Sequence, residues 1–188
     1  ITPDTAFRIA SMTKSFTALA VLKLRDEGRL SLEDPVSRWI PQFAGMERPT
    51  RDTPPLTIRQ LLSHSAGLTV HGFPGYAVDA PMPTLVQILN GEKPANTAAI
   101  RVDIAPGSRW RYSGGGYTVM QLLVMDVTGK SFPELTRELV FAPAGMRQST
   151  YENPLPKSLE ASAATAHGRN GDKVKGRWHI YPEMAAAG

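Results

Sequence analysis

Ser11 and Lys14 are the first two residues in the chain whose types and spacing could perform chemistry. A serine hydroxyl is a weak nucleophile at neutral pH, so an enzyme that uses one needs a proton acceptor beside it and donors for the oxyanion that forms. Side chains three residues apart share one face of a helix, and the helix start adds free N–H groups and a positive dipole end. The pair predicts acyl-transfer chemistry, although Ser-x-x-Lys also arises by chance and Ser11 alone could be a helix cap.

Tyr112 is the second candidate for this chemistry. It opens the run Tyr112-Ser113-Gly114, which lies between a short extended stretch and an apolar stretch. Function often resides in short loops of this kind, and a tyrosine there can relay a proton. The alternative is an aromatic ring packed at the end of a strand, which is the commoner role of a single tyrosine. Position in the sequence does not decide between the two.

The elements expected to position these residues are mostly helices. Residues 11–27 are apolar almost all round and Gly28 follows them, which predicts a buried helix beginning at Ser11. Thr57 and Gln60 form a capping box at the start of another helix. That helix is predicted to span residues 57–64, and further helices are predicted over residues 34–40, 84–90, 117–127 and 131–141.

The segments between and after these helices are expected to be irregular. Residues 70–83 are rich in glycine and proline and show no period, which predicts a long surface connection and a candidate wall of a cleft. Ser131 and Glu134 form a further capping box at the start of the last of these helices. Strands are expected only near Thr165 and Trp178.

The composition limits the classes of function that the chain can perform. Its 188 residues, 41% of them hydrophobic, can bury one ordinary core, so we expect one domain. The net charge of +4 comes from residues scattered along the chain, without the basic cluster that binds nucleic acid. No apolar run is long enough to cross a membrane. We therefore expect a globular protein with no nucleic-acid partner and no membrane span.

Metal and thiol chemistry are not expected. Cysteine is absent, which excludes a thiol nucleophile, a disulfide and a thiolate metal site. The histidines show no pairing with each other or with an acidic residue at metal-ligand spacing. They are His64, His71, His167 and His179. We expect neither a metal nor another cofactor, while the compartment and the oligomeric state stay open.

Four segments, in this order, are similar to segments of one known family. They are Phe-Arg-Ile-Ala-Ser-Met-Thr-Lys at 7–14, Gly-Arg-Leu-Ser-Leu-Glu-Asp-Pro-Val at 28–36, Leu-Leu-Ser-His-Ser-Ala-Gly-Leu at 61–68, and Pro106-Gly107 with Tyr112-Ser113. The family comprises the serine β-lactamases, the penicillin-binding D-alanyl-D-alanine peptidases and related esterases, and the class C-like branch is most similar. Four ordered matches over nearly the whole chain are far more specific than one.

The resemblance implies a fold and a set of roles. The expected fold is mainly α, the helical part of the β-lactamase-like α/β fold, with most of the antiparallel sheet outside the chain. Residues 1–188 would then form one domain that is incomplete at both ends. By the same resemblance Ser11 is the nucleophile, Lys14 helps to activate it, and Tyr112 is the base that later protonates the leaving group. His64 is structural by this comparison.

Two departures from the family pattern affect the expected chemistry. The second motif of the family is Tyr-x-Asn, and the asparagine amide touches the substrate, but here Gly114 stands in that position. Ser113 and Gly114 are nevertheless the expected substrate contacts. The third motif, Lys-Thr-Gly or His-x-Gly, is absent, because the runs at 167–169 and 175–177 have the wrong order. We expect it to lie outside the chain, which would impair catalysis by the isolated chain.

The function implied by the resemblance is hydrolysis, through an acyl-enzyme, of an ester, a β-lactam or a D-amino-acid peptide. Resemblance at the level of the fold does not choose among these substrates. The alternative is a non-catalytic relative that binds a peptide or a cell-wall fragment, and Gly114 is the residue that favours it. The family resemblance also favours a periplasmic or secreted location, with the cytoplasm as the other possibility.

Overall fold

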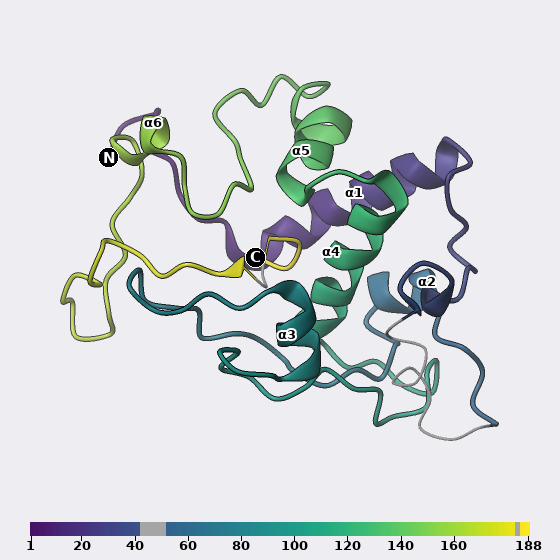
Figure 1. Ribbon diagram of the computed structural model, residues 1–188. Helices are drawn as coiled ribbons and strands as arrows, with labels where there is room; N and C mark the ends of the chain where they lie inside the picture. The colour runs from purple at the N-terminus through teal and green to yellow at the C-terminus, as the bar shows by residue number, and fades with distance from the viewer. Residues whose placement is uncertain (42–51, 183–184) are drawn as a thin grey trace.

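Helices joined by long loops make up the protein in this computed structural model, which describes residues 1–41, 52–182 and 185–188 (Figure 1). In chain order the elements are η1 (Ala10–Met12), α1 (Thr13–Asp26), η2 (Val36–Arg38), α2 (Ile58–Leu62), α3 (Leu85–Asn90), α4 (Gly114–Thr128), α5 (Phe132–Thr136), the π-helical turn η4 (Arg137–Phe141) and α6 (Lys157–Glu160). The prediction of a mainly α structure is confirmed. None of the described helices has both the length and the apolar character needed to cross a bilayer.

The two strands predicted near Thr165 and Trp178 do not form. The described residues contain only isolated β-bridges, among them one between His167 and Lys173 and one between Tyr76 and Ile180. The prediction was wrong because short alternating stretches form a strand only where a partner strand continues the ladder, and here each pairing stops after one bridge.

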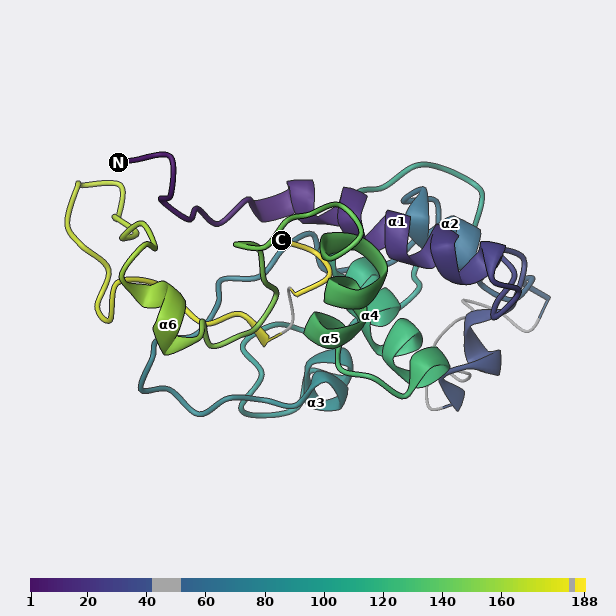
Figure 2. The same cartoon turned by 90° about the horizontal axis from the view of Figure 1, so that it is seen from above.

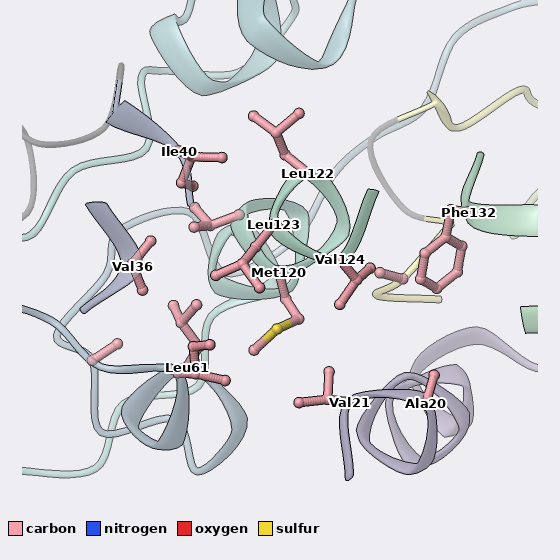
Figure 3. Packing of buried hydrophobic residues seen from close by; sticks show 14 of the residues in the cluster. Ala20, Val21, Val36, Ile40, Leu61, Met120, Leu122, Leu123, Val124 and Phe132 are labelled. Atoms are coloured by element: carbon pink, nitrogen blue, oxygen red, sulfur yellow. The ribbon is translucent and has the colours of Figure 1, made fainter. Parts of the chain in front are cut away.

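Helix α4 is the centre of the hydrophobic core. Every residue from 114 to 124 is buried, and α4 contacts α2, α3 and α5. Figure 3 shows Met120 of α4 pointing into the space between Leu61 of α2 and Val21 of α1. A helix that is apolar on nearly all sides must be covered on all of them, which explains its central position.

The helix ends follow their caps more closely than the apolar pattern. The capping box of Thr57 with Gln60 is confirmed at the start of α2. Helix α4 begins three residues before the predicted start, because the Ser113 hydroxyl caps it by accepting a hydrogen bond from the N–H of Gly116. Ser131 stands at the N-cap of α5, but its side chain makes no capping bond. The predicted capping box there was wrong; the proline in the first turn already removes one N–H that would need a cap.

The two ends of the described chain run beside distant segments. The N-terminal segment runs beside the residues that follow α6. Figure 1 draws this segment over α6, whereas Figure 2 shows α6 itself set apart from it. Two hydrogen bonds of Ala6 hold these segments together: its N–H donates to the Ser162 carbonyl, and its carbonyl accepts from the Ala164 N–H. Residues 185–188 run back to α1, where Ala186 and Ala187 are fully buried. This return of the chain brings backbone groups to the start of α1.

Truncation of Leu61 tests the packing around α4. Leu61 is 1% exposed in the core, so Leu61→Ala is expected to lower the free energy of unfolding by about 2–5 kcal/mol. Leu19 on α1 is 52% exposed, and Leu19→Ala should change it by less than about 0.5 kcal/mol. Urea unfolding followed by circular dichroism measures both. Equal losses in the two variants would contradict the packing described here.

Candidate active site

Ser11, Lys14 and Tyr112 meet at one point, although Tyr112 follows Ser11 by 101 residues in the chain. The Oγ atom of Ser11 lies 2.6 Å from the phenolic oxygen of Tyr112. The Nζ atom of Lys14 donates a hydrogen bond to the same Oγ at 3.2 Å. A nucleophile hydroxyl with two proton-handling groups in hydrogen-bond reach is the arrangement that general-base activation requires.

Short elements present these groups from two sides. Ser11 lies in the 3-10 turn η1, where its side chain is exposed, and Lys14 lies in the first turn of α1. Ala10, directly before Ser11, has a φ of +48°, which is uncommon for a residue with a side chain. Tyr112 stands two residues before α4. The start of each of the two long helices thus carries one part of the site.

Lys14 is a buried cation without an acidic partner in the part of the chain that the structure describes. Its side chain is 8% exposed, and Nζ also donates to the Ala187 carbonyl at 2.5 Å. Nζ lies 4.8 Å from the ring centroid of Tyr112 and 5.3 Å from that of Tyr117. Because none of the described carboxylates lies beside Nζ, its positive charge acts on Ser11 and Tyr112.

Backbone atoms of the returning C-terminal segment complete the surroundings of Lys14. Thr17, one turn along α1, donates its hydroxyl to the Ala186 carbonyl at 2.7 Å. Gln121 of α4 accepts a hydrogen bond from the Ala186 N–H at 3.1 Å. These two bonds fix Ala186 and so hold the neighbouring Ala187 carbonyl on the lysine.

The surroundings of Tyr112 favour its ionised form. Burial acts to raise the pKa of Tyr112, but hydrogen bonding to Lys14 and Ser11 and the positive charge of Lys14 outweigh it, so the pKa lies below the ordinary value of 10.0. Tyr117 shows the contrast, since burial and the nearby Tyr112 raise its pKa to about 12. Of these two tyrosines near Lys14, only Tyr112 has a lowered pKa.

The backbone of a neighbouring loop approaches position 114 so closely that glycine fits there without displacing it. Its N–H donates to the His71 carbonyl at 3.0 Å, and a Cβ atom placed on Gly114 would lie 2.9 Å from that oxygen. The N–H of Gly115 donates to the Val70 carbonyl at 3.0 Å, and a Cβ atom placed on Gly115 would lie 2.9 Å from the Thr69 carbonyl oxygen. The loop that contains residues 69–73 therefore sits directly on these glycines, and a side chain at position 114 would have to displace it.

Ser113 points away from Ser11 and into the protein. It is 3% exposed, and its hydroxyl donates to the carbonyls of Thr69 and Val70 while accepting from Gly116 N–H. Its expected role as a substrate contact finds no support in this geometry, because the hydroxyl is fully used in joining the loop to α4. Gly114, the other expected contact, does face the pocket described next.

A pocket of about 440 Å³ opens above Ser11. The residues that line it come from η1, α1, the 69–73 loop, the stretch before α4, the first residue of α4 and the C-terminal segment: Ser11, Lys14, His71, Gly72, Phe73, Trp110, Tyr112, Gly114 and Ala187. The sequence indicated the 70–83 segment as a candidate wall, and three of its residues take that place. The contribution of Trp110 to the pocket wall was not predicted, because a single exposed tryptophan forms no sequence motif that would indicate a site.

No group of three or more histidine and acidic side chains in the described ranges could hold a metal ion. His167 and Lys175, the residues of the misordered third-motif runs, do not line the pocket. Lys175 pairs instead with Asp79 on the surface.

The whole chain, residues 1–188, matches the model of one protein family, that of the beta-lactamases. The chain belongs to the beta-lactamase family. Protein flp of Staphylococcus aureus (strain MW2) is 33% identical over 159 residues, which are 83% of this chain and 30% of that protein. The D-alanyl-D-alanine-carboxypeptidase/endopeptidase AmpH of Escherichia coli (strain K12) is 31% identical over 148 residues, 79% of this chain and 37% of that protein. The chain thus spans about a third of the length of these relatives.

Solved structures of the beta-lactamase family show the same fold. The D-alanine carboxypeptidase AmpC of Burkholderia cenocepacia superposes with a TM-score of 0.73 and 22% identity, covering all of this chain and 46% of that one. The described residues of this family member correspond to the helix-rich part of the fold, as the resemblance implied.

Proposed function

We propose that the protein is a serine hydrolase that acts through an acyl-enzyme, with Ser11 as nucleophile and Tyr112 as general base. The observation that carries this proposal is the contact of Ser11 Oγ with the Tyr112 oxygen at 2.6 Å, beneath an open pocket. Lys14 supports both partners, because its charge favours the ionised tyrosine and its Nζ bonds Ser11 Oγ.

The proton can follow one route through the reaction. Ionised Tyr112 accepts the proton of Ser11 as Oγ attacks the carbonyl carbon of the substrate. When the tetrahedral intermediate collapses, the bond to the leaving group breaks and Tyr112 gives that proton to the leaving oxygen or nitrogen. Water then attacks the acyl carbon while Tyr112 accepts its proton, and collapse of this second intermediate returns the proton to Ser11.

The substrates proposed for this site are esters, β-lactams and peptides that end in a D-amino acid. The relative AmpH is named for carboxypeptidase and endopeptidase activity on D-alanyl-D-alanine, and membership of the beta-lactamase family supports the β-lactams. The pocket offers aromatic walls from Phe73 and Trp110, and at Gly114 it presents backbone without a side-chain amide. These features favour an ester or a peptide over a β-lactam.

Covalent labelling tests the proposal. A fluorophosphonate or a fluorescent penicillin is expected to add one adduct to the protein, located by peptide mass spectrometry on the segment that contains Ser11. Ser15 in the first turn of α1 is exposed and provides an internal control, because no base lies beside it among the described contacts. Absence of any adduct, together with reversible binding of a D-alanyl peptide, would favour the alternative of a non-catalytic binding protein.

A further inference from the structure

His64 holds the backbone on both sides of Tyr112. Its carbonyl accepts a hydrogen bond from the N–H of Arg111 at 2.8 Å. Its ring atom Nδ1 accepts a second one from the N–H of Ser113 at 3.2 Å. The residues directly before and after Tyr112 are thus both bound to this one histidine.

The imidazole ring of His64 also packs against the phenol ring of Tyr112. The ring centroids of His64 and Tyr112 lie 4.5 Å apart. The ring centroids of Tyr117 and Trp110 lie 5.3 Å and 6.0 Å from that of His64. This packing limits the rotation of the Tyr112 ring. Together with the two backbone bonds it fixes the direction in which the phenolic oxygen points toward Ser11.

Two details show that the position suits few residue types. The φ of His64 is +57°, a left-handed conformation that asparagine and glycine adopt more readily than other residues. The hydrogen bond from Ser113 requires a free lone pair on Nδ1, so the ring must be neutral and carry its proton on Nε2.

We propose that His64 is a positioning residue for Tyr112, and that only its neutral ring holds the Tyr112 oxygen in line with Ser11. This inference rests on the proposed function, because it concerns the base of that reaction. His64 itself does not touch the reacting atoms. It acts by fixing the residues on either side of the base.

Protonation of His64 would disturb the site in two ways. It would convert Nδ1 into a donor that faces the N–H of Ser113, and it would place a positive charge near Lys14. The titratable groups that face the ring are Lys14 from α1, His71 from the loop, and Tyr112 and Tyr117 from the start of α4. Burial, followed by the charges of Lys14 and His71, lowers the pKa of His64 from its ordinary value of 6.5.

Two substitutions separate the hydrogen bond from the backbone conformation. His64→Gly accepts the positive φ but removes Nδ1 and the ring. His64→Asn accepts the same φ and places its amide oxygen where Nδ1 stands, so it can still accept from Ser113 N–H. We expect His64→Gly to label at Ser11 about a hundredfold more slowly, because a base displaced by 1 Å can cost that much. His64→Asn should recover most of that loss.

The pH profile of labelling provides a readout that a purely structural role would not change. In every variant that keeps Tyr112 the labelling rate should fall about tenfold per pH unit below the pKa of that tyrosine. In the wild type it should fall more steeply still below the ordinary histidine range, since the imidazolium cannot accept from Ser113. His64→Asn should keep the fall due to Tyr112 and lack this extra steepening, because an amide does not titrate. In a Tyr112→Phe background, His64→Gly should have little further effect, since the residue that it positions has lost its reacting oxygen.

The outcomes distinguish this inference from the proposed function. Equal losses in His64→Gly and His64→Asn, with both variants shown by thermal unfolding to be folded, would overturn the positioning role. A steepening of the acid fall that persists in His64→Asn would overturn it as well. A wild-type protein with no adduct at Ser11 would instead overturn the proposed function, and this inference with it.

Discussion

Replacing Ser11 with alanine is expected to lower the rate of ester hydrolysis by about a millionfold, the loss seen when comparable acyl-transfer enzymes lose their nucleophile. The expectation follows from the structure of the site, in which the hydroxyl of Ser11 is exposed to the pocket and bonded to both Tyr112 and Lys14. Without Oγ no acyl-enzyme can form, and Tyr112 and Lys14 are left with no group to activate. Turnover of a chromogenic ester and of a chromogenic cephalosporin would measure the loss.

Ser15→Ala provides the matched control for this measurement. Ser15 lies in the first turn of α1, four residues after Ser11, and is exposed. Its replacement should leave turnover unchanged within a factor of about two, since isolated surface substitutions rarely have large effects. A Ser11→Ala variant that keeps a tenth or more of the wild-type rate would show that another group carries the reaction.

Local spacing was sufficient to predict the first half of this site. Ser11 and Lys14 stand three residues apart at the start of an apolar stretch, and helix geometry alone brings their side chains together. Tyr112 could be added only through the family resemblance. Its contact with Ser11 spans 101 residues and depends on how α1 and α4 pack, which no local pattern specifies.

Residues that contribute to the site through backbone atoms could not be predicted from the sequence. The carbonyls of His71 and Ala187 contribute to the site, but every residue has a carbonyl, so no residue type marks them. His64 was predicted to be structural. Its link to Tyr112 passes through the N–H groups of Arg111 and Ser113 and through a left-handed backbone, neither of which can be seen in a motif.

The caps explain both the accurate and the inaccurate predictions of the fold. A capping box is a local contact, and at Thr57 the pattern was sufficient to place the start of α2. The start of α4 was predicted too late because a run of three glycines normally weakens a helix. Here the first two glycines, Gly114 and Gly115, lie so close to the loop that carries His71 that a side chain would not fit at either position.

Replacing Tyr112 with phenylalanine is expected to lower the rate of acylation by about a hundredfold to ten-thousandfold, the range found for general bases. The substitution removes only the phenolic oxygen that lies 2.6 Å from Ser11 Oγ. It keeps the ring that packs on His64 and faces Lys14. The loss therefore reports the proton transfer and not a collapse of the site.

The pH dependence should identify Tyr112 as the group that titrates. Only the ionised phenol can accept a proton, so below the pKa of Tyr112 the wild-type rate should rise about tenfold for each pH unit. Because Lys14 and Ser11 hold that pKa below 10.0, this rise should level off at a lower pH than for an ordinary tyrosine. Tyr112→Phe should lack the rise altogether.

Tyr117→Phe is the control that separates Tyr112 from a general effect of tyrosines near Lys14. The ring of Tyr117 also faces Lys14, at 5.3 Å, but its hydroxyl donates to the Leu62 carbonyl and its pKa is raised to about 12. Tyr117→Phe should weaken the fold by about 1 kcal/mol through the lost hydrogen bond and leave the pH profile of acylation unchanged. If the alkaline rise survives in Tyr112→Phe and disappears in Tyr117→Phe, the base has been assigned to the wrong tyrosine.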